Sequence, residues 1–232
     1  VPLAVRVLAR WKMDQSIRSV LVQFHLPIPK RSEPVTLQWG RPRTTADLPI
    51  TEVTWDAADG FIKLPVFWLC DSRVIGEQVP MGGHSFAEYD KNIQTYYPQR
   101  RDDPLKGDIR ADGYYSTPHV FYQLYVRSGD PEIFLSARKE LLNFREKEIQ
   151  LEGNKRGAHV KYGEPRYVYV QPLVDDYLLT GDERSKEVAG YMAQDLKEKV
   201  NAEEGFYPKN SDYFWTERYY AAVVVGVISY HE

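Results

Sequence analysis

The sequence contains a single cysteine among its 232 residues, which excludes an internal disulfide framework. Cys70 lies in the apolar run 64–70, and we interpret it as a buried small hydrophobic residue, not as a nucleophile. The longest apolar run, residues 221–229, is too short and too mixed to cross a bilayer. No membrane span is therefore predicted.

A basic excess is also lacking, because 30 Lys and Arg residues face 33 Asp and Glu residues, giving a net charge of −3. This balance argues against nucleic acid as a partner. No Gly-rich loop that could cradle a phosphate is present, and no cluster of His, Cys and carboxylate residues has the spacing of metal ligands. We expect no cofactor, although a Ca²⁺ ion held by Asp102, Asp103 and Asp108 stays open as an alternative.

The sequence is rich in aromatic residues, with 17 Tyr and 5 Trp. The period of its hydrophobic pattern changes near the middle of the chain. Residues 1–80 alternate in polarity and predict an antiparallel β-rich domain, barrel- or sandwich-like, with strands at 5–11, 17–26 and 35–39. A fourth strand is predicted at 61–69, at an edge or bulge because of Pro65. Residues 81–112 predict a polar connector loop that is either functional or mobile.

From residue 113 to 232 the period is helical. We predict one helical hairpin from 114–128 and 131–150, a second from 166–180 and 183–200, and the start of a third at 216–232. The two joints match at a constant offset of 52 residues, as in Gly129 and Gly181 or Asp130 and Asp182. Each Gly is expected to end a helix in the left-handed conformation, and each Asp to cap the next helix.

The first helix of each hairpin is aromatic and the second is charged, which predicts an inner and an outer row of helices. The predicted fold class is thus α+β, an antiparallel β segment followed by helical hairpins of an incomplete α/α-toroid. Only two and a half hairpins can be counted. The chain also opens without Met and stops within a helical pattern, so we expect a processed or truncated chain.

The segment 8–24 carries a family resemblance. Its residues Trp11, Asp14, Ser16, Ile17 and Arg18 resemble a Trp-x-x-Asp-Gly-Ser-hydrophobic-Arg pattern, in which Gln15 stands where Gly is usual. That pattern is typical of the RIFT-barrel-like N-terminal domain of proteins related to exo-rhamnogalacturonan lyase (the PcRGLX/YetA-like group). Segments 175–182 and 214–218 resemble the toroid of the same group and of many polysaccharide lyases and glycoside hydrolases. The resemblance implies a carbohydrate-active protein.

A polysaccharide lyase needs a base that removes the proton beside a uronate carboxylate, and cations or amides that neutralise that carboxylate. A Tyr base needs a neighbouring cation to lower its pKa. The candidate catalytic residues lie at the starts of the predicted inner helices: His119, His159, Tyr115, Tyr167 and Arg166. Each also has a purely structural interpretation, such as a hydrogen-bonded histidine inside a helical row.

Candidate substrate-binding residues cluster at the start of the last predicted helix, where Trp215 offers a sugar platform and Arg218 a carboxylate partner. The full predicted set is Trp215, Glu217, Arg218, Tyr219, Tyr122 and His84. Glu217 is equally suited to the positive end of the helix dipole, and His84 to a solvated loop.

The predicted function is β-elimination on an acidic polysaccharide or oligosaccharide outside the cytoplasm, in an extracellular or periplasmic space. Two alternatives stay open. A glycoside hydrolase would need two carboxylates facing one cleft, with candidates at Asp108, Asp112, Glu164, Asp175, Asp176 and Glu217. A non-catalytic glycan-binding or surface-assembly protein could use the same scaffold, and self-association is left open.

Overall fold

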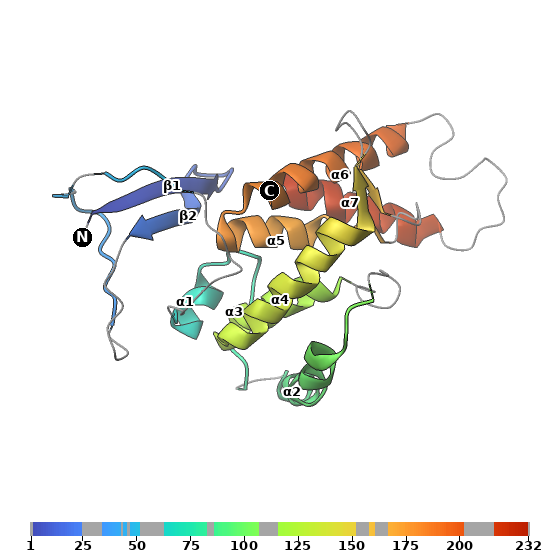
Figure 1. Ribbon diagram of the computed structural model, residues 1–232, viewed down its shortest axis with the longest axis horizontal. Coiled ribbons are helices and arrows are strands. Elements are labelled where there is room, and N and C mark those ends of the chain that lie inside the picture. The colour runs from blue at the N-terminus through green and yellow to red at the C-terminus, as the bar shows by residue number, and fades with distance from the viewer. Residues whose placement is uncertain are drawn as a thin grey trace.

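The computed structural model describes residues 2–24, 34–42, 44–45, 47–51, 63–82, 86–106, 116–151, 158–160, 167–201 and 216–231. The side chains of residues 158–160, 199–201 and 216–220 lie outside this description. In this part of the chain, an N-terminal two-stranded antiparallel sheet is followed by seven α-helices and a second short sheet (Figure 1). The predicted α+β class is confirmed.

The elements, in chain order, are β1 (Leu3–Arg10), β2 (Ile17–Phe24), α1 (Val66–Asp71), α2 (Ala87–Asp102), α3 (Thr117–Ser128), α4 (Pro131–Asn143), the π-helical turn η2 (Phe144–Glu148), β3 (Ile149–Leu151), β4 (Ala158–Val160), α5 (Gln171–Thr180), α6 (Glu183–Asn201) and α7 (Thr216–His231).

Strands β1 and β2, which correspond to the strands predicted at 5–11 and 17–26, form an antiparallel hairpin joined by a tight turn. The Asp14 carboxylate accepts hydrogen bonds from the backbone N–H and the hydroxyl of Ser16, at 3.0 and 2.7 Å. Gln15 has a φ of 59°, in the left-handed region that glycine reaches without strain. This is the position at which the resembling pattern has glycine.

Three predictions for the segment between the hairpin and the helices are wrong. Residues 35–39 form no strand, and 61–69 contain the beginning of helix α1, because Pro65 ends an extended stretch and precedes the first helical residue. The predicted connector 81–112 contains the 16-residue helix α2. This helix has a poor apolar stripe and is held by tertiary contacts, including a 2.8 Å hydrogen bond between the hydroxyls of Tyr97 and Ser136.

The two helical joints have the predicted chemistry. Gly129 and Gly181 are left-handed, with φ values of 66° and 74°. Asp130 and Asp182 each accept a hydrogen bond at 2.9 Å from the backbone N–H two residues on. The hairpin pattern of the sequence is therefore confirmed at its turning points.

The bounds of two helices differ from prediction. The helix predicted for 131–150 ends at Asn143, and the chain continues through the π-helical turn into strand β3. The helix predicted to open at Arg166 begins at Gln171, where Pro172 occupies the first turn. Tyr167 thus lies before the helix and is 2% exposed.

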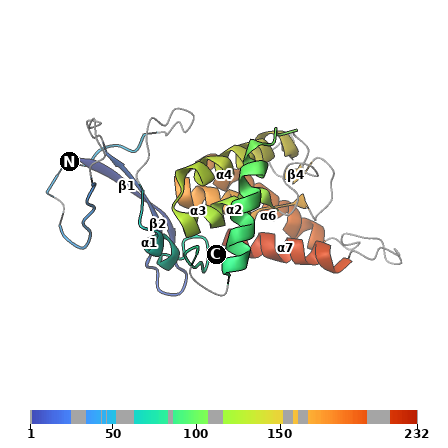
Figure 2. The same cartoon turned by 90° about the horizontal axis from the view of Figure 1, so that it is seen from below.

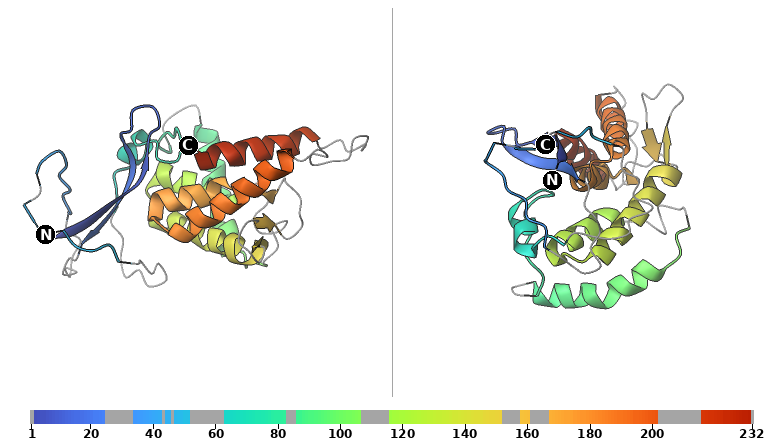
Figure 3. Two further views of the ribbon diagram at one scale, coloured as in Figure 1. Left: turned by 90° about the horizontal axis from the view of Figure 1, so that it is seen from above. Right: turned by 60° about the vertical axis from the view of Figure 1, so that its left-hand side comes forward.

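The helices pack in two rows. Helix α5 contacts α3 on one side and α7 on the other, while α4 packs against α3, and α6 against α5 and α7 (Figures 1 and 3). Helix α2 crosses the outside of this array, as Figure 2 shows. The core between the rows is aliphatic and aromatic, and its most deeply buried large side chains include Tyr122, Leu124, Leu141, Leu173, Met192 and Leu196. No helix in the described ranges is long and apolar enough to span a membrane.

A buried polar network crosses this core around Asp176, which is 0% exposed. Its carboxylate accepts hydrogen bonds from the Tyr122 hydroxyl at 2.6 Å, the Arg138 guanidinium at 2.5 Å and the Ser185 hydroxyl at 2.5 Å. These four residues come from α5, α3, α4 and α6. The network therefore fixes four helices relative to one another.

Asp182 extends the network into the second joint, where its carboxylate also accepts hydrogen bonds from Arg138 at 2.5 Å and Arg145 at 2.9 Å. Burial alone would raise the pKa of Asp182, but these guanidiniums outweigh burial and hold the pKa below the ordinary value of 3.8. At pH values above 3.8, the ionised Asp182 carboxylate therefore stabilises the folded state. The contribution is lost as the pH falls through the lower pKa of the folded state.

We predict that Asp182→Asn lowers the free energy of unfolding at neutral pH by about 2–4 kcal/mol, because Arg138 and Arg145 each lose one of two carboxylate partners and keep only Asp176 and Glu146, respectively. It should also flatten the loss of stability below about pH 4. Asp130→Asn is the matched control, since Asp130 makes the same cap with no ion pair in the described part of the chain. Asparagine caps nearly as well, so this control should change stability by less than about 0.5 kcal/mol. Urea unfolding of both variants and the native protein, at pH values from roughly 3 to 7, measures the free energies of unfolding across the range in which aspartates titrate. Equal losses in the two variants would contradict the prediction.

Candidate functional site

A histidine–aspartate pair lies between the neighbouring helices α3 and α5. His119, in the first turn of α3, places its Nδ1 atom 2.5 Å from the Oδ2 atom of Asp175 in α5. The His119 side chain is 14% exposed and the Asp175 side chain 5%. An aspartate acceptor at Nδ1 favours the neutral tautomer that carries its proton there, which leaves the Nε2 lone pair free to act as a base.

The β-hairpin brings a cation toward this pair. Burial raises the pKa of Asp175, while the charges of His119 and Arg18 oppose that rise. Arg18 is anchored through hydrogen bonds to the backbone carbonyl of Val74, the shorter at 3.1 Å, and its guanidinium lies 4.6 Å from the ring centroid of Trp11. Trp11 and Arg18, two residues of the family-like pattern, thus hold a positive charge near the pair.

Two sequence-predicted site residues are structural. Tyr122 is 0% exposed, and burial raises the pKa of its phenol well above the ordinary value, so it stays a neutral donor to Asp176. Tyr167, 2% exposed, is part of the hydrophobic core. Both side chains are buried, so neither presents a surface to a ligand.

The remaining predicted site residues cannot be compared with the structure. Tyr115, Arg166, Trp215 and His84 lie outside the described residues, and the side chains of His159, Glu217, Arg218 and Tyr219 are not described.

The predicted calcium ligands are partly described. Asp102 pairs with Arg101 at 2.8 Å and Asp103 lies 4.0 Å from Arg100, while Asp108 is outside the described part. Within the residues for which side chains are given, no group of three or more His, Cys, Asp or Glu side chains is placed to hold a metal. The described geometry adds nothing to the calcium alternative.

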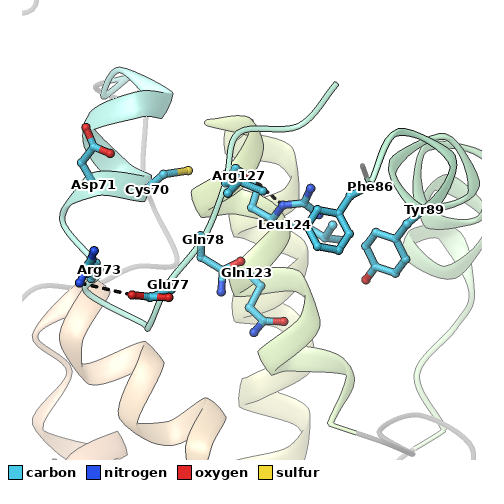
Figure 4. A pocket seen from close by; sticks show the side chains of 11 residues that line it. Cys70, Asp71, Arg73, Glu77, Gln78, Phe86, Tyr89, Gln123, Leu124 and Arg127 are labelled. Atoms are coloured by element: carbon cyan, nitrogen blue, oxygen red, sulfur yellow. Dashed lines mark hydrogen bonds and ion pairs between the residues drawn. The ribbon is translucent and has the colours of Figure 1, made fainter. Parts of the chain in front are cut away.

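A groove of about 870 Å³ lies between the segment 70–79, the start of α2 and helix α3 (Figure 4). Its polar and aromatic lining was not predicted from the sequence. The lining residues are Cys70, Asp71, Arg73, Glu77, Gln78, Val79, Phe86, Tyr89, Gln123, Leu124 and Arg127. Gln123 lies one helical turn after His119, about 6 Å farther along α3, so the groove begins close to the histidine–aspartate pair.

One wall of the groove is held by a buried ion pair. Arg127 donates to the Asp90 carboxylate at 2.6 Å and to the backbone carbonyl of Val79 at 2.9 Å. Asp90 also accepts a hydrogen bond from the backbone N–H of Gly82 at 3.0 Å. These contacts join α2, α3 and the segment between α1 and α2.

Comparisons with protein-family models, with curated proteins and with solved structures gave no match for this chain.

We predict that Asp90→Ala lowers the free energy of unfolding by about 3–5 kcal/mol, because it leaves the Arg127 guanidinium buried without a carboxylate. The amides of α2 should exchange with deuterium faster than in the native protein. Glu88→Ala, at an exposed position of the same helix, is the control and should change stability by less than about 0.5 kcal/mol. Replacing both partners, as Asp90→Leu with Arg127→Met, should recover part of the loss. A loss in Asp90→Ala no larger than that of the control would contradict this role of the ion pair.

Proposed function

We propose that this protein cleaves a uronate-containing glycan by β-elimination and that its helical hairpins form part of an α/α-toroid. The observation that carries the proposal is the histidine–aspartate pair, in which Asp175 orients a partly exposed imidazole. Histidine is the commonest general base in enzymes, and here a carboxylate orients its ring. The two rows of helices and the repeated Gly–Asp joints support the toroid.

In the proposed reaction, Nε2 of His119 takes the proton from the carbon beside the uronate carboxylate. The electron pair left on this α-carbon forms a double bond to the neighbouring β-carbon. At the same time the bond between the β-carbon and the glycosidic oxygen breaks. The departing oxygen takes up a proton from the imidazolium or from water. Asp175 stabilises the imidazolium that exists between the two proton transfers.

The negative charge that builds up on the substrate carboxylate requires a cation. Arg18 is the candidate among the described residues, because its charge already acts on Asp175. Arg166 and Arg218 remain candidates from the sequence. An acidic polysaccharide substrate is consistent with a location outside the cytoplasm, in an extracellular or periplasmic space.

A glycoside hydrolase is the second candidate, favoured by Asp71 and Glu77, which both line the groove. Of the carboxylates considered from the sequence, Asp175 is paired with His119 and Asp176 is committed to the core network. A non-catalytic glycan-binding protein is the third candidate, and it would use the groove without the histidine.

We predict that incubation with polygalacturonate or alginate produces the ultraviolet absorbance of an unsaturated uronate, and that His119→Gln reduces its rate by about 100-fold or more. Asp175→Asn should reduce the rate as well, because asparagine can hold the other tautomer. His231→Ala is the control, since His231 is an exposed histidine in the last turn of α7. Circular dichroism should show that all variants are folded.

Three other outcomes would reject this mechanism. New reducing ends without the absorbance would indicate hydrolysis, and binding without product would indicate the non-catalytic scaffold. Elimination that persists at the native rate in His119→Gln would remove His119 from the reaction.

A further inference from the structure

We infer that the groove is a binding site for a neutral sugar ring, chemically distinct from the acidic residue proposed to react at His119. The inference does not depend on catalysis. Two aromatic side chains, Phe86 and Tyr89, line the groove although they are 55% and 49% exposed. They precede and open helix α2 at a spacing of three residues, which places them on one face (Figure 4).

Exposed aromatic rings in a concave site offer flat apolar faces to a ligand that has a flat apolar face of its own. The C–H face of a pyranose ring meets this requirement. The groove volume of about 870 Å³ lies within the range of small-molecule sites, about 300–1,000 Å³.

A guanidinium lies over one face of the Tyr89 ring. The Arg127 guanidinium lies 5.8 Å from the centroid of its ring and is itself held by Asp90 and by the Val79 carbonyl. A ring that is already ordered loses less conformational entropy on binding. The exposed surface of Tyr89 is therefore a pre-organised platform.

The charges of the groove decide which sugar fits. Of the two guanidiniums that line it, Arg127 is neutralised by Asp90 at 2.6 Å and Arg73 by Glu77 at 3.3 Å. Asp71 forms no ion pair within the residues that the structure describes, whereas both guanidiniums that line the groove have a carboxylate partner. A uronate or a phosphate would therefore have to compete with Asp90 or Glu77 for a lining guanidinium and would lie near the Asp71 carboxylate, whereas a neutral sugar needs no cation.

Hydrogen-bonding groups suited to sugar hydroxyls occupy the same groove. The side-chain amides of Gln78 and Gln123 provide both donors and acceptors, and the Asp71 carboxylate provides acceptors. Gln123 also places this site one helical turn beyond His119. A glycan that reaches both would present a uronate at His119 and a neutral sugar at the groove.

The test is isothermal titration calorimetry of the native chain with cellohexaose, xylohexaose and mannohexaose as neutral probes and with oligogalacturonate as the acidic probe. We expect at least one neutral probe to bind, and more tightly than oligogalacturonate. Phe86→Ala and Tyr89→Ala should each weaken that binding by roughly five- to tenfold. The matched control is Tyr96→Ala, because Tyr96 is 62% exposed on the same helix and does not line the groove.

Thermal unfolding of the three variants checks that lost affinity is not lost structure. His119→Gln should bind the neutral probe as the native chain does, which separates this inference from the proposed elimination. The inference is overturned if no neutral probe binds at millimolar concentration, if oligogalacturonate binds more tightly, or if Phe86→Ala and Tyr89→Ala bind like Tyr96→Ala.

Discussion

The buried carboxylate of Asp176 is the constraint on which the arrangement of the helices depends. A charge with no access to water is tolerated only when hydrogen bonds replace its hydration, and Asp176 receives them from Tyr122, Arg138 and Ser185. Since these partners belong to three other helices, the helices cannot shift without leaving a buried charge unpaired. The neighbouring residue Asp175 turns toward His119 instead. The network that stabilises the core therefore also sets the geometry of the candidate site.

The joints between helices bear a second constraint, because the N-terminal part of the chain packs against both. Arg6 donates to the backbone carbonyl of Gly181 at 3.1 Å, and a Cβ atom at Gly129 would lie only 3.0 Å from a methyl group of Val66. Each glycine is thus needed for its left-handed φ and, at Gly129, for close approach as well. The capping residue Asp182 is likewise explained by two guanidiniums and a helix end, without any catalytic role.

Sequence reasoning succeeded where the cause is local. The hairpin of β1 and β2, the helical joints and their caps depend on neighbouring residues, and all were predicted. Helix α2 was missed because contacts with α4 hold a mostly polar segment helical. His119 was identified, and Asp175 was named only as a possible hydrolase carboxylate. Their pairing was not predicted, since 56 residues separate the two and only the packing of α3 on α5 brings them together. The groove was missed for the same reason, because three separate segments form it.

One sequence signal would have pointed to the groove. His119, Gln123 and Arg127 are spaced by four residues, so they form one polar stripe along a helix whose other faces are largely apolar. Each of the three meets a different element: His119 contacts α5, Gln123 faces the groove, and Arg127 pairs with α2. A polar stripe on a core helix has to be satisfied by partners from outside that helix or by a ligand. Partners are present at both ends of this stripe, and the groove opens between them, so a ligand there would be held by surroundings that the fold has already fixed.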